Sequence, residues 1–292
     1  MSSAELLQFL ITGITVGFTY ALIAIGFSII YNASDVVNFA QGEFVMIGAL
    51  STISLHSRGL PLPIAILGGV AGTALLGIAL EKLAVERARG SSVITTAIIT
   101  IGASIFFRGL AMVIWGKEIY QMPHFSGETP LRLFGATLLP QHLWVMAGAV
   151  SLMAFFWYFF NHTLFGKAMR ACSYNKTAAS LVGIRVKTVL ASAYAISAAL
   201  GAISGVLIAP ISYMTYDAGT MLGLKGFAAA ILGGMGSASG AIVGGLCLGL
   251  LEAFSAGIIS SSYKDAVTFI VILLVLFFKP SGILGKKEAE RV

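Results

Sequence analysis

The 292-residue sequence contains few charged residues. Asp, Glu, Lys and Arg together make up 10% of it, against about 25% in an ordinary soluble domain, and 58% of the residues are hydrophobic. This composition excludes an ordinary soluble globular protein, because charged side chains normally cover much of the surface of such a protein.

Cysteine and histidine are also scarce. The two cysteines, Cys172 in a basic segment and Cys247 in an apolar run, support neither a disulfide framework nor a metal site. The four histidines are scattered over expected loop or interface positions, and pairs such as Gly166-Lys167 lack the Ser or Thr that follows in a phosphate-binding loop. We therefore predict that the chain is not an enzyme and has no catalytic residue, metal or cofactor of its own.

Long apolar runs fill most of the sequence. Residues 6–34, 188–216 and 226–251 carry no charge, and each run exceeds the roughly 20 residues that a helix needs to cross a bilayer. Continuous runs of this length predict an all-α, polytopic transmembrane helix bundle with about eight spans. The net charge of +6 does not indicate a nucleic-acid partner, since the basic residues lie between apolar runs and suit a lipid membrane instead.

One basic segment, residues 163–187, orients the predicted bundle. It contains no acidic residue, and its charges are Lys167, Arg170, Lys176, Arg185 and Lys187. Lys and Arg in short loops mark the cytoplasmic side. A charged loop at 81–90 is separated from this segment by two predicted spans, 93–116 and 143–161, so both loops are expected on the cytoplasmic side, together with the basic C-terminal tail. The intervening loop, 117–142, is then extracytoplasmic.

The glycine-rich stretch at 232–240 predicts a broken helix. If the tail is cytoplasmic, residues 226–278 must cross the membrane an odd number of times, although they contain only one long apolar run and one shorter one. Glycine costs about 1 kcal/mol relative to alanine within a helix. We therefore expect a half-helix over 225–232, an unwound or re-entrant turn, and a new helix from about 241.

The N-terminal half has a similar feature, because residues 35–55 begin polar and then form a short helix. Both halves thus combine a long helix with a short one, which suggests an internal repeat. Glu43 either lines a polar pathway or caps this short helix. Arg108 is expected to extend to the outer interface and Glu252 to mark a helix end. The candidate pathway residues are Asn38, Gln41, Glu43, Gly233, Gly234, Gly236 and Ser237.

The basic segment also has a helical pattern of its own. Asn175 or Ser173 can cap a helix over 176–182, and Gly183 suits the left-handed position that closes it. Such a helix presents small apolar residues outside the membrane, where topology alone does not require them. We interpret it as a docking surface for a soluble partner.

Five motifs, in this order, resemble a known family. They are TYALIAIGF at 19–27, NFAQGEF at 38–44, GKAMRAC at 166–172, GFAAAILGGMGS at 226–237 and KPSGILG at 279–285. Together they resemble the LivH-type permease subunit of branched-chain amino-acid ABC importers, over nearly the whole chain. The resemblance implies one transmembrane permease domain, residues 1–292, in a bacterial-type inner membrane, moving branched-chain or related amino acids inward by alternating access.

The resemblance also implies partners: a second related permease subunit, two cytoplasmic ATPases that bind the ATP, and an extracytoplasmic solute-binding protein. Residues 177–183, TAASLVG, are similar to the coupling motif of ABC importers, except that Thr177 stands where Glu is typical. The implied ATPase-coupling residues are Lys167, Arg170, Ala178, Ala179 and Gly183.

Two alternatives stay open from the sequence. An ion-coupled or proton-coupled secondary transporter of a small polar solute would use Asp35, Glu43 and Arg108 as coupling groups. A gated channel built on the turn at Gly233 is the other. The exact substrate, whether a branched-chain amino acid, another amino acid or a urea-like amide, does not follow from the motifs.

Overall fold

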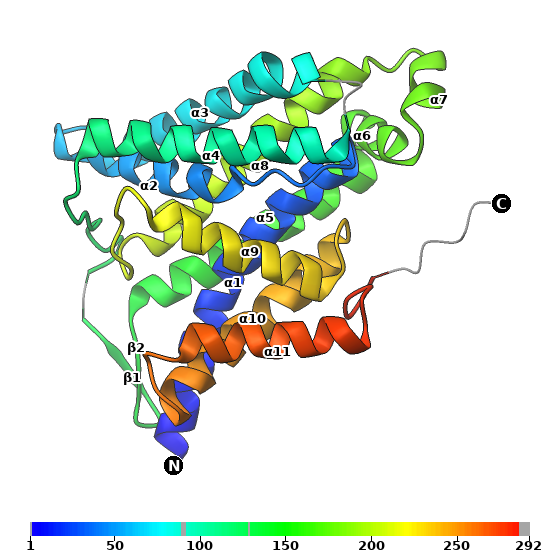
Figure 1. Ribbon diagram of the computed structural model, residues 1–292. Helices are drawn as coiled ribbons and strands as arrows, with labels where there is room; N and C mark the ends of the chain where they lie inside the picture. Colours follow the sequence, from blue (N-terminus) through cyan, green and yellow to red (C-terminus); the bar gives the residue numbers. More distant parts are fainter. Residues whose placement is uncertain (1, 89–91, 128, 286–292) are drawn as a thin grey trace.

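The computed structural model describes residues 2–88, 92–127 and 129–285, and in this part of the chain the helices form one bundle with a short hairpin beside it (Figure 1). The α-helices are α1 Ser3–Ser34, α2 Gln41–Ser57, α3 Leu62–Leu80, α4 Val93–Trp115, α5 Pro140–His162, α6 Leu164–Tyr174, α7 Lys176–Leu181, α8 Val186–Ile208, α9 Ala218–Gly233, α10 Ala238–Ile258 and α11 Lys264–Phe278. A π turn, Glu81–Val85, and a 3-10 turn, Glu86–Ala88, extend α3. Strands β1, Leu131–Leu133, and β2, Ala136–Leu138, pair antiparallel. The predicted helical bundle is confirmed.

Within the described residues, six helices are long and apolar enough to cross a membrane: α1, α3 with its extension, α4, α5, α8 and α10. Helix α9, with 16 residues, is a shorter apolar helix, and α2 and α11, with 17 and 15 residues, are also shorter than the six. The predicted number of about eight spans is therefore not confirmed.

Helix α1 lies at the centre of the bundle. Of its apolar part 83% is buried, against 11% of that of α5, which lies at the periphery. Small residues allow α10 to approach it closely: a Cβ on Gly17 would lie 2.9 Å from the Cα of Leu246, and Gly249 faces the backbone of Gly13 and Gly17 in turn. Close backbone packing of this kind holds helices together where lipid gives no hydrophobic drive.

The α1–α10 contact predicts a destabilised variant. Gly17→Leu is expected to force the two helices apart and to lower the thermal midpoint of the protein in detergent, at a cost of about 1–3 kcal/mol, which is typical of overpacking. Gly72→Leu is the matched control, because a Cβ there meets no atom within 4 Å. Equal midpoints for the two variants would contradict the packing argument.

The bundle has two distinct ends. At the first, which we call the basic end, Lys176 Nζ lies 2.6 Å from Asp35 Oδ2, and Lys187 Nζ lies 2.8 Å from Glu86 Oε1. These pairs bring together the end of α1, the extension of α3 and the basic segment. At the opposite end Trp115 Nε1 donates to Ser54 Oγ, and the backbone N–H of Thr137 donates to Gln8 Oε1.

The described part of loop 81–90 and the basic segment lie together at the basic end, so their predicted common side is supported. Arg89 and the basic residues of the C-terminal tail lie outside the described residues. The expected loop at 81–88 is wrong, however: the chain continues from α3 as helical turns. The sequence also missed α6 and the hairpin, since α6 has only a short amphipathic pattern and each strand has three residues.

Helix α2 begins in the middle of the bundle. Gln41, its first residue, contacts Ser197, which is midway along α8, and Ser197 Oγ lies 2.8 Å from the carbonyl oxygen of Gly26 within α1. The non-helical residues 35–40 lead to this point along α4, where the backbone N–H of Phe39 donates to Thr100 Oγ1. Side-chain bonds of this kind make a non-helical backbone tolerable at membrane depth.

Helices α9 and α10 form the predicted break. Helix α9 ends at Gly233 and α10 begins at Ala238, so the unwound turn at 232–240 is confirmed. Gly234 and Gly236 take φ angles of 108° and 84°, which other residues rarely adopt. The expected start of α9 at 225 is wrong by seven residues, because the helix begins at Ala218. Each half thus has a long helix, a non-helical segment and a short helix, which favours the predicted internal repeat.

Candidate functional site

The two short helices meet at their N-termini. A Cβ on Gly42, in the first turn of α2, would lie 2.6 Å from the Cα of Gly223 in α9, and a Cβ on Gly219 would lie 3.0 Å from the Cα of Glu43. Both N-termini direct the positive ends of their helix dipoles toward this region. Broken helices arranged in this way build substrate sites in several transporter folds.

Glu43 is buried at this meeting point. Its Oε1 accepts a hydrogen bond from Ser104 Oγ of α4 at 2.9 Å and a longer one from Thr220 Oγ1 of α9 at 3.4 Å. Its Oε2 is buried and has no hydrogen-bond partner. A buried carboxylate oxygen without a hydrogen-bond partner is energetically costly.

Arg108 turns toward the same point. Its Nη1 donates to Thr220 Oγ1 at 3.1 Å, so the expected extension to the outer interface is wrong. The Thr220 hydroxyl stands between the guanidinium and Glu43, and no direct ion pair joins Arg108 to Glu43 within the described residues. The two opposite charges are therefore close together without forming a direct ion pair.

A cavity of about 290 Å³ lies beside these groups, between α4 and α9. Phe27, Phe39 and Phe227 form one wall, with ring centroids 5.7 Å apart for Phe27–Phe227 and 5.6 Å apart for Phe39–Phe227. Ser104, Arg108 and Thr220 line its polar part. The cavity thus combines an aromatic surface with one cationic side chain and hydroxyl groups next to Glu43.

Two other predicted pathway residues have local structural roles at the same depth. Gln41 Nε2 donates to the carbonyl of Ser197, and its Oε1 accepts from Ser197 Oγ at 2.6 Å. Asn38 Oδ1 accepts from the backbone N–H of Ala40, and its buried Nδ2 has no partner. Gln41 therefore fixes the start of α2, while Asn38 keeps one free donor near the site.

The remaining predicted pathway residues lie elsewhere. Gly233, Gly234, Gly236 and Ser237 form the α9–α10 turn, which is separated from Thr220 by about 20 Å of helix. This turn belongs to the basic end: the backbone N–H of Leu284 donates to the carbonyl of Gly233, and Asn32 Nδ2 donates to that of Gly236. The structure does not bring the two predicted groups together, because they lie toward opposite ends of α9.

A second buried polar group, missed in the sequence, joins four helices, α1, α9, α10 and α11. Lys225 Nζ lies 2.8 Å from Glu252 Oε1 and 2.8 Å from Asp265 Oδ1, and Lys264 Nζ lies 3.1 Å from the same Glu252 oxygen. Tyr20 of α1 donates its hydroxyl proton to Glu252 Oε2 at 2.7 Å. Glu252 lies within α10, so its expected position at a helix end is wrong. The only signal in the sequence was that Lys225 and Glu252 flank the apolar run 226–251.

The basic segment folds as two short helices. Asn175 caps α7 by accepting from the backbone N–H of Ala178, and Gly183 takes a φ of 88°, so both predicted end signals are confirmed. Ala178 and Gly183 are exposed, whereas Ala179 lies on the buried face of α7. Leu181 and Val182 are 83% and 77% exposed. Lys167 is exposed on α6, and Arg170 on the same helix contacts Asn161 at the end of α5.

Spanning helices with a broken pair and buried charged groups between them are typical of a membrane permease. Residues 9–276 match the family described as the permease component of branched-chain amino acid transport systems, and the chain belongs to this family. It is a multi-pass integral membrane protein.

Relatives cover nearly the whole chain. It is 34% identical to the high-affinity branched-chain amino acid transport system permease protein LivH of Escherichia coli (strain K12), over 98% of this chain and 97% of the relative. The permease protein BraD of Pseudomonas aeruginosa is also 34% identical, with 98% of each chain covered. The ribose import permease protein RbsC of Escherichia coli (strain K12) is 26% identical over 88% of this chain and 80% of the relative.

One solved structure has a similar fold. It is described as PsaBC from Streptococcus pneumoniae in complex with Fab, and it matches with a TM-score of 0.51 over 95% of this chain and 92% of that chain, at 17% identity. At this identity the match speaks for the helical fold alone.

Proposed function

We propose that the chain is the membrane-spanning subunit of an ABC importer that moves branched-chain or related amino acids inward by alternating access. Membership of the permease family carries this proposal, and it favours an ATP-driven importer over the ion-coupled alternative. The arrangement of charges agrees with it, because Asp35 pairs with Lys176 at the basic end, far from Glu43 and Arg108. The three groups required for the ion-coupled alternative therefore do not form one site.

The pathway is proposed to pass the meeting point of α2 and α9. An amino acid carries an ammonium and a carboxylate, and here Glu43 Oε2 and Arg108 supply the opposite charges on either side of Thr220. The ring wall of Phe27, Phe39 and Phe227 suits an aliphatic side chain. Such a site needs only modest affinity, because a solute must leave it in every transport cycle.

The basic end is proposed to face the cytoplasm of a cell with a bacterial-type inner membrane. Its docking surface, the exposed residues of α7 with Val182 and Gly183, would contact one of two ATPases that bind and hydrolyse the ATP. A second related permease subunit and an extracytoplasmic solute-binding protein complete the proposed importer. The exposed apolar surfaces of α3, α4 and α5 leave room for lipid and for that second subunit.

Leu181→Glu tests the docking surface. It is expected to leave membrane insertion intact and to abolish ATP-driven uptake, because a carboxylate would replace an apolar contact with the ATPase. Uptake and ATP hydrolysis are measured together in vesicles that contain the complete importer. Gly183→Arg is the weaker test, because a left-handed φ strains any side chain at that position.

Leu60→Glu serves as the control for this experiment. Leu60 is an exposed leucine between α2 and α3, at the end of the bundle away from α7. It is expected to retain uptake. If the Leu181→Glu variant shows ATP-driven uptake at the rate of the unsubstituted protein, α7 is not part of the proposed interface.

A further inference from the structure

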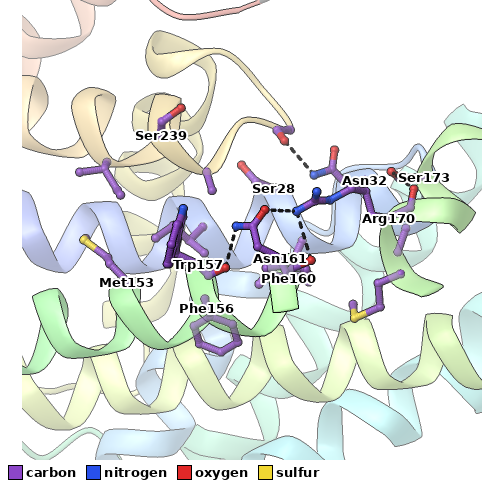
Figure 2. Close-up of a pocket in the computed structure, with 17 residues that line it drawn as sticks. Ser28, Asn32, Met153, Phe156, Trp157, Phe160, Asn161, Arg170, Ser173 and Ser239 are labelled. Carbon is purple, nitrogen blue, oxygen red and sulfur yellow. Dashed lines mark hydrogen bonds between the residues drawn. The ribbon is translucent and has the colours of Figure 1, made fainter. Parts of the chain in front are cut away.

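A second cavity lies at the basic end, away from the translocation site. It has a volume of about 320 Å³ and lies between α1, α5, α6 and the start of α10. Figure 2 shows its polar residues Arg170, Asn32 and Ser173 gathered at one end, with Met153 toward the other. Its apolar part includes Ile25 and Ile29 of α1, Phe156 of α5 and Ile242 of α10. The cavity is therefore amphipathic along its length.

Arg170 is held in place at the polar end. Its Nη2 donates to the carbonyl of Phe160 at 3.1 Å and to Asn161 Oδ1 at 2.9 Å, and Asn161 is in turn fixed by a 2.7 Å bond from its Nδ2 to the carbonyl of Trp157. An arginine has five N–H donors, so three of them stay available. No acidic residue lines the cavity among the residues that the structure describes, which leaves the charge of Arg170 without a counter-ion there.

Ser28 gives a second, independent observation. It lines the cavity from α1, the residue is 3% exposed, and its Oγ is buried without a hydrogen-bond partner. Asn32 follows one turn later on the same helix, and Figure 2 shows both side chains on the cavity side of α1. A buried hydroxyl without a partner costs free energy unless a ligand supplies an acceptor.

We infer that this cavity binds an anionic phospholipid. The phosphate would accept hydrogen bonds from Arg170, a glycerol ester carbonyl would accept the proton of Ser28, and an acyl chain would lie against Ile29 and Phe156. Helix α5 also exposes Phe155 and Tyr158, and Trp157, which lines the cavity, is 63% exposed, so lipid has direct access to this flank of the bundle. Basic pockets between spanning helices bind phospholipid head groups in other membrane proteins.

The lipid is placed where it would influence coupling. The cavity is lined by α6, which directly precedes the docking helix α7, by Gly236 of the α9–α10 turn, and by Ala238 and Ser239 at the start of α10. An occupant would therefore brace the basic segment against the broken helix.

Native mass spectrometry of the full-length protein, purified in mild detergent with any subunits that accompany it, tests the inference. Phosphatidylglycerol is titrated against phosphatidylcholine and, in a separate arm, against inorganic phosphate. The unsubstituted protein is expected to retain one phosphatidylglycerol per chain in preference to phosphatidylcholine. Arg170→Gln is expected to weaken retention about fivefold, the effect of one basic group at a membrane surface. Ser28→Ala should weaken it by a smaller factor.

Arg185→Gln is the matched control, since Arg185 belongs to the same basic segment but does not line the cavity. It is expected to retain phosphatidylglycerol as the unsubstituted protein does. Three outcomes would overturn the inference: equal weakening by Arg170→Gln and Arg185→Gln, equal retention of phosphatidylcholine, or displacement of the lipid by millimolar inorganic phosphate.

Discussion

Lys225→Met is expected to cause the largest loss of stability of any single substitution considered for this chain. Lys225 contacts Glu252 and Asp265 at the junction of α9, α10 and α11, and its side chain is 8% exposed. Removing one member of a buried ion pair leaves its partner uncompensated, at a cost of about 3–5 kcal/mol. The low dielectric around spanning helices keeps the cost of an unpaired charge high. This cost is measured by thermal unfolding in detergent, monitored as the loss of soluble protein.

Two companion variants separate the charge effect from the loss of packing. Lys264→Met removes the other lysine of the group, which is 40% exposed, and is expected to cost much less because water reaches it. The double variant Lys225→Met, Glu252→Gln removes charge from both sides and is expected to recover part of the lost stability. If the double variant is no more stable than Lys225→Met, uncompensated charge is not the cause.

Glu43→Gln is expected to reduce uptake about tenfold to a hundredfold, while ATP hydrolysis by the complete importer continues. Gln keeps the size of the side chain and can still accept a hydrogen bond from Ser104, but it cannot neutralise an ammonium at the position of Oε2. Hydrogen bonds to charged groups contribute about 1.5–3 kcal/mol, which corresponds to this range of rates. Initial uptake of labelled leucine or isoleucine into vesicles measures the effect.

Arg108→Gln tests the other half of the same site. It removes the guanidinium that donates to Thr220, and it is expected to weaken uptake of an amino acid more than that of an amide without a carboxylate. Glu118→Gln, an exposed change between α4 and β1, is the control for loss of charge alone. Unchanged uptake in both Glu43→Gln and Arg108→Gln would move the pathway away from the junction of α2 and α9, while leaving the family assignment intact.

The long helices could be predicted because their signals are local. Residues 93–116 and 143–161 were expected as spans, and α4 and α5 begin and end within three residues of these limits. The turn at 232–240 and the cap at Asn175 were also found, since glycine and asparagine determine backbone conformation where they stand. Helix α6 was missed because eleven residues of mixed character resemble a loop.

The candidate site was predicted only in part. Glu43 was predicted as a candidate because a carboxylate next to an apolar run is unusual. The sequence could not decide between a role in capping α2 and a role in lining a pathway. The structure contradicts the capping alternative, because Glu43 lies in the first turn of α2 but makes no capping hydrogen bond, and its carboxylate contacts Ser104 of α4 and Thr220 of α9 instead. Arg108 was assigned to the interface because nothing in its own helix reveals Thr220, which follows 112 positions later.

The sequence by itself determined the class of protein, the common end at which its basic segments lie and the position of the broken helix, because hydropathy, charge and glycine act over a few neighbouring residues. The tertiary structure alone decided which charges meet. Glu43 and Arg108 come together around Thr220, and Lys225 reaches Glu252 and Asp265, because separate helices converge in the bundle. The cost of burying charge is then settled by partners that are distant in sequence.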